Sequence, residues 1–506
     1  MFDVAIVGCG PVGALAANLL GRAGLSVVIL EKERALHPLP RAVHCDHEIL
    51  RLFQSAGVIA RLLPDLTDTD GNLHVGADMG VIRTMVTVGM ARPYGWANDW
   101  FFYQPELEAH LRAGFAEMAH VELRAGAEFT GLAQDGDAVR LRYRQDGRAA
   151  ELTARWAIAC DGSRSPMRKA LGVALDDLDF EEPWLVVDAE VDGPVHFPEI
   201  SGLPEGVDLQ RLSVMLCDPR RPATIVPGRG RHRRWEFMLL PGETDEAMMA
   251  PAVVDALVGA WLGAMPHRIL RAATYRFHGL VAARWRVGNV FLAGDAAHQT
   301  PPFFGQGMCH GLRDVANLAW KLAAVARDGA DAALLDSYQP ERDPHVRAVI
   351  AAAVAAGRYI CEIDPQNAAR RDAEMRARAA SGVQETATDL VPALAAGVVL
   401  TGTPGAGERF IQPRLDDGRL LDDATGGGWR LFVRSPAAAM TAAGVTTVAV
   451  TASGDGGALA AWLDARGVDA VLLRPDHYVF GTARGSAGPL LSAWRKALGL
   501  PSPVLA

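Results

Sequence analysis

Two short apolar runs near the start of the chain flank a glycine-rich turn and an alanine-rich stretch in which apolar residues recur at helical spacing. This pattern predicts a strand over residues 4–7, a helix over about residues 11–22 and a strand over residues 27–30. Strand, helix and strand in this order form the β-α-β unit that opens a doubly wound sheet. Further elements of the same domain are predicted at residues 106–119 (helix) and at residues 121–124, 138–143 and 151–158 (strands).

The pattern changes between about residues 183 and 267, where β-branched and aromatic residues alternate with polar ones between Pro and Gly turns. We predict a second, mainly antiparallel sheet in this region. The chain then returns to a buried strand over residues 289–293, a proline-rich turn and a long helix over about residues 307–327. A nucleotide-binding domain is therefore interrupted by a β-sheet domain and then resumed.

The last third of the chain divides into two regions. Residues 345–398 are alanine-rich and are predicted to be helical. A compositional break follows at residues 401–405, and strand patterns then recur at residues 429–433, 445–450 and 468–473. These patterns predict a small α/β domain at the C-terminus.

Composition and charge narrow the class of protein. The chain has 506 residues, 22% of them charged, and a net charge of −9 with no long basic run, so nucleic acid is a poor candidate partner. The N-terminus has no basic segment of a signal peptide, and no apolar run reaches the roughly 18 residues of a membrane span. We therefore predict a cytoplasmic protein that does not enter the membrane. The six cysteines are scattered without C-x-x-C or a metal-like pairing with histidine, so we predict neither disulfides nor a metal site.

The first motif is Gly8-Cys9-Gly10-Pro11-Val12-Gly13, which lies between the predicted first strand and helix. The first glycine permits a tight turn, the second lets the backbone approach a pyrophosphate, and the third lets strand and helix pack closely. Glu31 ends the second strand, where a carboxylate can accept hydrogen bonds from ribose hydroxyls and disfavours a 2′-phosphate. The motif therefore predicts the adenosine of FAD or NAD rather than of NADP.

Two further motifs follow predicted strands. Residues 155–166 run from an apolar strand into Cys160-Asp161-Gly162, and residues 288–298 run from a strand into Gly294-Asp295. The second of these is followed by the turn Pro301-Pro302-Phe303-Phe304-Gly305-Gln306-Gly307-Met308. Either segment alone is an ordinary junction of strand and turn, but their joint presence after the glycine motif is specific.

With these three motifs the chain resembles the single-component (class A) FAD-dependent aromatic hydroxylases, typified by para-hydroxybenzoate hydroxylase and phenol hydroxylase. It is most similar to the 3-(3-hydroxyphenyl)propionate hydroxylase branch. The stretches that carry the branch-level resemblance are residues 40–43, 103–106, 217–219, 232–238 and 305–308.

The resemblance implies an α/β fold with a Rossmann-type FAD-binding domain interleaved with a mainly antiparallel β-sheet substrate domain, and a thioredoxin-like C-terminal α/β domain. We divide the chain accordingly into an FAD-binding domain (1–72, 98–182 and 268–345), a substrate-binding domain (73–97 and 183–267), a helical connection (346–398) and the C-terminal domain (399–506).

The resemblance also implies which residues bind FAD. The ADP half is assigned to Gly8, Gly10, Pro11, Val12, Gly13 and Glu31, the pyrophosphate to Arg41, and the ribityl region to Gln104, Gly294 and Asp295. Asp161 is assigned to a position shared by FAD and the nicotinamide, and the flavin ring to Pro302, Gly305, Gly307, Met308 and Cys309. Backbone N–H groups at a helix start suit a reduced, anionic flavin because the N-terminus of a helix favours negative charge.

The implied activity is hydroxylation of a phenolic ring with NADH or NADPH as a transient co-substrate, O₂ and a flavin C4a-hydroperoxide. A 3-hydroxyphenylpropionate-like acid is the expected substrate class. For catalysis we predict Pro302, whose carbonyl can orient the substrate, and His44, Tyr103 and His298 as candidate acid–base residues, with His310 as a further candidate. Each of the histidine and tyrosine candidates, taken singly, is more often a packing residue than a catalytic one.

Two other functions are compatible with the sequence. One is a tailoring oxygenase that hydroxylates a polycyclic phenol or performs a Baeyer–Villiger insertion on it in secondary metabolism, and the other is a flavin-binding module that serves assembly without turnover. The C-terminal domain has no C-x-x-C and is not expected to have dithiol activity. The oligomeric state stays open, with a homodimer as one option.

Overall fold

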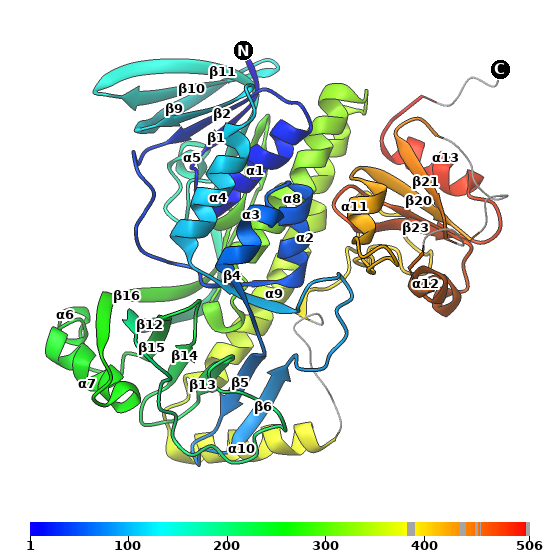
Figure 1. Cartoon of the computed structure of the whole chain (residues 1–506). Coiled ribbons are helices and arrows are strands. Elements are labelled where there is room, and N and C mark those ends of the chain that lie inside the picture. Colours follow the sequence, from blue (N-terminus) through cyan, green and yellow to red (C-terminus); the bar gives the residue numbers. More distant parts are fainter. Residues whose placement is uncertain (382–389, 435–441, 451–453, 456, 502–506) are drawn as a thin grey trace.

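The structure is a computed structural model that describes residues 1–381, 390–434, 442–450, 454–455 and 457–501 (Figure 1). Two large sheets lie one above the other in the view of Figure 1, and a smaller C-terminal unit lies to one side.

The first large sheet has the strand order β17-β18-β11-β1-β2-β8, with β10 and β9 attached to β11. Its strands are β1 (Phe2–Val7), β2 (Val27–Glu31), β8 (Val121–Ala125), β9 (Ala127–Asp135), β10 (Ala138–Gln145), β11 (Arg148–Ala159), β17 (Arg286–Val287) and β18 (Val290–Leu292). Strands β2, β1, β11 and β18 pair in parallel, and the register places Val7 beside Ala159 and Ala159 beside Leu292. The carboxyl ends of these strands therefore meet at one edge of the sheet, which is where doubly wound sheets bind ligands.

The helices around this sheet are α1 (Pro11–Arg22), α4 (Gln104–Ala116), α5 (Pro166–Ala170) and α8 (Gly307–Arg327). The alanine-rich face of α1 is buried against the sheet because small side chains let the helix approach the backbone closely. The β-α-β unit predicted from the first 30 residues is confirmed, with β1 two residues longer than expected.

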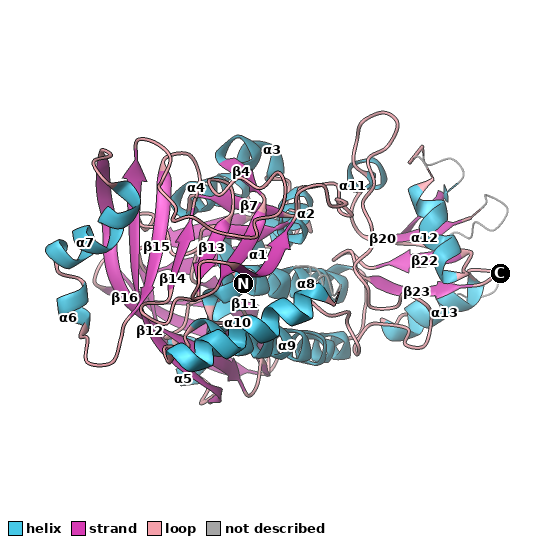
Figure 2. Cartoon of the chain, turned by 90° about the horizontal axis from the view of Figure 1, so that it is seen from below, coloured by secondary structure: helices cyan, strands magenta, loops and turns pink. Residues whose placement is uncertain are grey.

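The second large sheet has the order β19-β16-β12-β15-β14-β13-β5-β6. Its strands are β5 (Gly71–Val75), β6 (Val81–Val86), β12 (Leu175–Val191), β13 (Ser213–Leu216), β14 (Ala223–Val226), β15 (His232–Met238), β16 (His267–Ala282) and β19 (His298–Gln299). Figure 2 shows α6 (Asp245–Met248) and α7 (Pro251–Leu262) on its outer side, where Trp235 and Phe237 form a core with α7. The opposite face contributes Trp184, Met215 and Met238 to the core shared with the first sheet.

A three-stranded sheet and two long helices complete this part of the molecule. The small sheet has the order β3-β7-β4, with β3 (His44–Asp46), β4 (Leu66–Thr69) and β7 (Asp99–Phe102). The remaining helices here are α2 (His47–Ser55), α3 (Ile59–Leu62), α9 (Tyr338–Ile360) and α10 (Pro365–Ala380), and the 3₁₀ turns are η1 (Leu63–Asp65), η2 (Gly294–Ala296), η3 (Pro302–Phe304) and η4 (Ala332–Ser337).

The C-terminal unit has a four-stranded sheet in the order β21-β20-β22-β23. Its elements are α11 (Leu421–Thr425), β20 (Trp429–Val433), β21 (Val445–Ala449), α12 (Ala458–Arg466), β22 (Ala470–Leu473), β23 (Val479–Ala483) and α13 (Gly488–Ala497). β20 pairs in parallel with β21 and antiparallel with β22, and β22 pairs antiparallel with β23. The predicted fold class, with a thioredoxin-like C-terminal unit, is confirmed.

Some sequence-based bounds differ from the structure. The helical region predicted over 345–398 ends with α10 at Ala380. Residues 391–398 are not helical, and 382–389 lie outside the described residues. The proposed domain boundaries at 182/183 and 267/268 fall within β12 and at the start of β16, so the division into domains stays a prediction. Among the described residues, no helix combines the length and apolar composition that a bilayer span requires.

Candidate functional site

The glycine turn between β1 and α1 has the geometry that a bound pyrophosphate requires. Gly8 has φ +96°, and a Cβ atom there would lie 2.3 Å from the Cys160 carbonyl oxygen; a Cβ on Gly13 would lie 2.0 Å from the Gly8 oxygen. A Cβ on Gly10, in contrast, would meet only the Arg41 guanidinium, at 4.0 Å. The first and third glycines therefore permit close packing, and the second leaves its backbone open beside a cation at the start of α1.

Two charged side chains, those of Glu31 and Arg112, form hydrogen bonds with the backbone of this turn. The Glu31 carboxylate accepts hydrogen bonds from Cys9 N at 2.6 Å and from Glu33 N at 2.9 Å. Arg112 Nη2 on α4 donates to the Cys9 carbonyl at 2.9 Å. Each carboxylate oxygen can accept more than one hydrogen bond, so Glu31 keeps the capacity to bind a ribose hydroxyl while it supports the turn.

Gln104 fixes the Arg41 loop. Its Oε1 accepts hydrogen bonds from Arg41 N at 2.8 Å and Ala42 N at 2.7 Å, and its Nε2 donates to Glu108 at 2.7 Å. Gln104 is buried, whereas the Arg41 side chain is exposed. The structure thus gives Gln104 a loop-holding role that the sequence did not indicate, and it leaves the Arg41 guanidinium available to an anion.

Asp161 and Asp295 lie at the same edge because they follow the adjacent strands β11 and β18. Asp161 Oδ2 accepts a hydrogen bond from Met167 N at 2.9 Å, while its buried Oδ1 has no partner among the described residues. Burial raises the pKa of Asp161, although the Ser165 hydroxyl and the Met167 N–H oppose the shift. Asp295 lies in turn η2 with its side chain exposed. The unpartnered Oδ1 and the exposed carboxylate are the kind of polar groups that a cofactor would satisfy.

The proline-rich turn leads into the start of α8. Pro302 begins η3, and Gly305 ends it in the left-handed conformation at φ +63°. The first helical hydrogen bond of α8 runs from His310 N to the Gln306 oxygen, so the N–H groups of Gly307, Met308 and Cys309 belong to the unpaired first turn. These N–H groups and the dipole of a 21-residue helix suit the anionic edge of a reduced flavin.

Val12 packs where α1, η2 and α8 cross. A Cβ on Gly311 would lie 2.6 Å from Val12 Cγ2, and one on Gly294 would lie 3.1 Å from it. Pro11 is buried at the first position of α1. Both residues therefore shape the backbone around the predicted site, and small residues opposite them let the three segments meet.

His44 is a predicted acid–base residue that the structure places against the Gly305 turn. Its Nε2 is 2.9 Å from Asp99 Oδ1, and a Cβ on Gly305 would lie 2.7 Å from its Nδ1. Burial favours the neutral imidazole, but the hydrogen bond and charge of Asp99 outweigh it and raise the pKa of His44. His44 therefore lies against the turn that contains Pro302.

The other histidine and tyrosine candidates have different surroundings. Tyr103 donates its hydroxyl to the Pro38 oxygen at 3.1 Å and contacts the His232 ring. His298 is buried, with Nε2 2.6 Å from Asp314 Oδ2, and His310 is buried close to it. Burial lowers the pKa of His310 well below its ordinary value. This geometry favours packing roles for His298 and His310 and a loop-holding role for Tyr103.

Asp314 on α8 organises the site without having been predicted. Its carboxylate accepts hydrogen bonds from Gly294 N at 3.0 Å, from the His298 ring and from Arg342 Nε at 3.0 Å. It therefore fixes the turn that presents Asp295. The sequence signal for it is a charged pair, Arg313-Asp314, within a mostly apolar helix.

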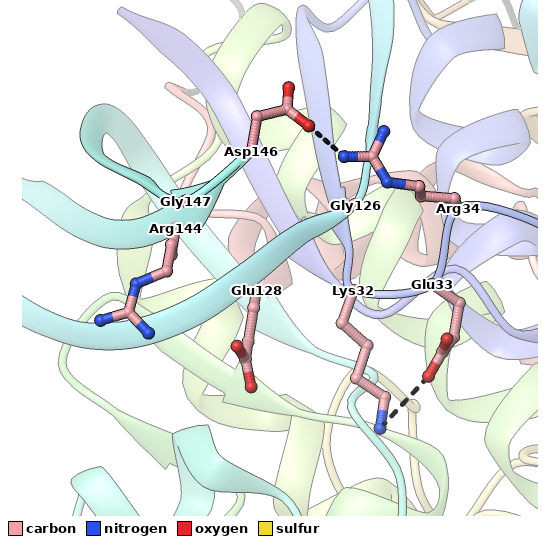
Figure 3. Close-up of a pocket in the computed structure, with 8 residues that line it drawn as sticks. All are labelled: Lys32, Glu33, Arg34, Gly126, Glu128, Arg144, Asp146 and Gly147. Atoms are coloured by element: carbon pink, nitrogen blue, oxygen red, sulfur yellow. Dashed lines mark hydrogen bonds and ion pairs between the residues drawn. The ribbon is translucent and has the colours of Figure 1, made fainter.

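A separate charged depression of about 470 Å³ lies next to the residues that follow Glu31 in the chain (Figure 3). Lys32, Glu33 and Arg34 border it on one side, and Glu128, Arg144 and Asp146 on the other. Figure 3 shows that Arg34 pairs with Asp146 and Lys32 with Glu33. Sites for aromatic rings are mostly apolar, so this depression does not suit the ring of a phenol.

Comparison with known proteins identifies the family. The family described as the FAD binding domain matches residues 1–353, and the family described as the HcaD C-terminal domain matches residues 407–496. A 3-(3-hydroxy-phenyl)propionate/3-hydroxycinnamic acid hydroxylase of Burkholderia cenocepacia (strain HI2424) is 35% identical, over 96% of this chain and 95% of that protein. The chain belongs to this family of FAD-binding aromatic hydroxylases. The predicted class of flavoprotein aromatic monooxygenase is therefore confirmed, and FAD is its cofactor.

Other members of the family extend the comparison. A probable NADH-specific resorcinol 4-hydroxylase of Rhodococcus jostii (strain RHA1) is 35% identical, over 96% of this chain and 92% of that protein. Among solved structures, aklavinone-11 hydroxylase in a ternary complex with FAD and aklavinone has a TM-score of 0.79 at 24% identity and covers 98% of this chain and 99% of that chain. At that identity the structural likeness supports the fold alone.

Proposed function

We propose that this flavoprotein hydroxylates a phenolic compound related to a 3-hydroxyphenylpropionate-like acid, with NADH or NADPH and O₂ as co-substrates. The observation that supports it is the convergence of Gly10, Asp161 and Asp295 at the carboxyl edge of one parallel sheet, beside the Pro302 turn. The names of the two hydroxylase relatives, which refer to hydroxyphenylpropionate and to resorcinol, favour a small phenol.

The residues present fit FAD. The open backbone at Gly10 and the exposed Arg41 would hold the pyrophosphate, Glu31 the adenosine ribose, and Asp295 the ribityl chain. The unpaired N–H groups of Gly307, Met308 and Cys309 would hold the flavin's pyrimidine edge, and Asp161 would lie between the cofactor and the passing nicotinamide. When bound, FAD supplies the redox chemistry that activates O₂.

The protein's own part is to orient the ring, exclude water and manage protons. Pro302 is half-buried at the start of η3, where its carbonyl accepts a hydrogen bond from Gly305 N at 2.8 Å and has a second lone pair that can accept one from a substrate hydroxyl. His44 is held at Nε2 by Asp99, so the proton that it exchanges is at Nδ1, on the side of Gly305. We retain His44 and Pro302 as the residues that act next to the reacting ring, and Tyr103 and His298 as supporting residues.

The test of this function starts from the purified chain reconstituted with FAD. NADH and NADPH are each added with 3-(3-hydroxyphenyl)propionate, resorcinol and a polycyclic phenol, and cofactor oxidation is followed together with product mass. We expect one small phenol to stimulate oxidation and to gain one oxygen atom. Protein that takes up no FAD, or phenols that stimulate oxidation without gaining oxygen, would contradict the proposal.

Cellular location and assembly belong to the proposal as well. We place the enzyme in the cytoplasm, where NADH and NADPH are supplied, and expect no nucleic-acid partner because the net charge is −9. A homodimer stays a prediction, which light scattering of the FAD-loaded protein tests directly.

A further inference from the structure

One row of side chains crosses the second sheet from β16 to β6. Register pairs link its members strand by strand, in the order Ala273, Val186, Glu236, Thr224, Met215, His74 and Arg83. Residues directly opposite each other on adjacent strands share a face of the sheet. The row therefore places a carboxylate, a hydroxyl, a thioether, an imidazole and a guanidinium on one face.

This face is the one turned toward the FAD-binding residues. Successive side chains of a strand point to opposite faces, and the two neighbours of Glu236, Trp235 and Phe237, belong to the core under α7. Glu236 therefore points away from α7. Met215, from the same row, packs in the core that the second sheet shares with the first.

The neighbours of Glu236 on its own face locate it more closely. Arg234, two residues earlier on β15, donates from Nη1 to the Arg41 oxygen at 2.7 Å and from Nη2 to the Pro40 oxygen at 2.9 Å. On the other side, Met238 is paired with Trp184, whose ring centroid is 5.9 Å from that of Phe303. Glu236 thus lies between the loop that carries Arg41 and the turn that follows Pro302.

The Glu236 carboxylate has no partner among the residues that the structure describes. It is half-buried, and it makes no hydrogen bond or ion pair with any residue that the structure describes. Asp188, one row away, pairs in contrast with His232, Arg234 and Arg271. An inward-facing carboxylate without a donor is expected to receive one from a ligand.

Electrostatics is consistent with a basic carboxylate. Burial raises the pKa of Glu236; the charges of Arg234 and Arg271 oppose this effect, and that of Asp188 adds to it. A higher pKa brings the carboxylate closer to that of a phenol, which is about 10, and so makes proton transfer between them less unfavourable.

Resting on the proposed hydroxylase function, we propose that Glu236 accepts the hydrogen bond of the substrate's phenolic hydroxyl and takes its proton in the reacting complex. The O–H bond of the phenol breaks, its electron pair stays on the phenolate oxygen, and a new O–H bond forms on Glu236. The phenolate ring is the more electron-rich form and therefore the better acceptor of an electrophilic oxygen atom. A carboxylate at this point also repels an anionic substituent, so an acidic side chain of the substrate lies away from Glu236.

The proposal is tested first by binding. FAD-loaded enzyme is titrated with 3-(3-hydroxyphenyl)propionate and with its methyl ether, 3-(3-methoxyphenyl)propionate, which cannot donate a hydrogen bond, and binding is followed by the change in flavin absorbance. We expect the wild type to prefer the phenol by about 10- to 100-fold, the range for a hydrogen bond to a charged group. In Glu236→Val the preference should fall to about twofold or less, because the acceptor is gone.

A second variant separates proton transfer from binding. Glu236→Gln keeps a hydrogen-bond acceptor but removes the base, so hydroxylation at neutral pH should slow by about 100-fold or more. The rate should recover as the pH approaches about 10, where the phenol ionises by itself. Glu190→Gln is the matched control, since Glu190 lies on β12 of the same sheet with its carboxylate paired to Arg268 near the solvent, and it should change neither measurement.

Three results would overturn the proposal. They are a wild type that binds phenol and ether equally, a Glu236→Val variant that keeps the full preference, and a Glu236→Gln variant with an unchanged pH profile. If His44→Asn abolishes the preference while Glu236→Val keeps it, the acceptor is His44. A wild type that prefers the phenol but hydroxylates nothing refutes the hydroxylase function instead, so the two failures are distinguishable.

Discussion

The buried carboxylate of Glu341 stabilises the contact between the C-terminal unit and the rest of the protein, and its removal tests how much that contact contributes to stability. Its Oε2 accepts hydrogen bonds from Asn317 at 2.6 Å and from Arg474 at 2.7 Å and lies 2.8 Å from Lys321 Nζ, and its Oε1 accepts one from Val398 N at 2.7 Å. Asn317 and Lys321 belong to α8, Glu341 to α9, and Arg474 follows β22. Glu341→Gln therefore removes one charge at the point where these elements meet.

The magnitude follows from the charges around this carboxylate. Burial favours the neutral form, but Arg474 and Lys321 outweigh it and lower the pKa of Glu341 from 4.5 to about 2. That difference is equivalent to about 3 kcal/mol of stability at neutral pH. Removing one partner of a buried ion pair costs about 3–5 kcal/mol in general, because it leaves the other charge uncompensated. We therefore expect Glu341→Gln to lower the free energy of unfolding by about 3 kcal/mol.

The pH dependence has a definite sign. Because the folded-state pKa of Glu341 is depressed, its contribution is fully present above 4.5 and is lost as the pH falls from there toward about 2. The difference between wild type and variant should therefore be largest at neutral pH and should shrink on acidification. A difference that grew in acid would contradict this account.

Urea unfolding monitored by tryptophan fluorescence measures the effect. The rings of Trp320 on α8 and Trp429 on β20 are 5.5 Å apart across the same contact, so the signal reports its separation. Glu374→Gln, at an exposed position of α10, is the control. A loss at Glu341 of less than about 0.5 kcal/mol, the range of ordinary surface substitutions, would refute the reasoning.

Two further predictions concern FAD retention. Gly8→Ala should weaken FAD binding at least about 10-fold, because φ is +96° there and a Cβ would lie 2.3 Å from the Cys160 oxygen, at a cost of about 1–3 kcal/mol. FAD release measured by fluorescence checks this. The control Gly136→Ala, where φ is +57° but nothing lies within 4 Å, should keep its FAD. Asp188→Asn should destabilise the protein by about 3 kcal/mol. It should also weaken FAD binding, because Arg234 would hold the Arg41 loop less firmly. Equal FAD affinity in the variant and the wild type would show that this loop does not contribute to FAD binding.

The motifs were predictable from the sequence because each follows a strand whose apolar pattern is local. Asp161 and Asp295 come directly after β11 and β18, so parallel pairing alone brings them to one edge. Glu236 could not be found in this way. Its place beside the Arg41 loop depends on the pairing of β15 with β12 and on the contact of Arg234 with Arg41, 193 residues away in the chain, and no local pattern encodes either.

The same limit applies to the histidines. His44 and His298 both lie close to motif residues in the sequence, and both resemble candidate bases there. In the structure, the hydrogen-bond partner of His44 is Asp99 on β7, which holds it beside the Gly305 turn, whereas the partner of His298 is Asp314 on α8, which holds it inside the core. Which carboxylate meets which imidazole is decided by tertiary packing and not by neighbouring residues.

A chain of buried hydrogen bonds explains why a domain without redox cysteines accompanies the flavin site. The Tyr478 hydroxyl of the C-terminal unit donates to Glu48 Oε1 at 2.8 Å, and Arg313 Nε donates to Glu48 Oε2 at 2.7 Å. Arg313 Nη1 in turn donates to Gln306 Oε1 at 2.9 Å, at the residue that caps α8. Glu48 is buried between these donors, so the hydroxyl from the C-terminal unit satisfies an acceptor that would otherwise be left short of a partner. The C-terminal unit thus completes the hydrogen bonds that hold the first turn of α8, the turn whose N–H groups face the flavin edge in the proposed complex.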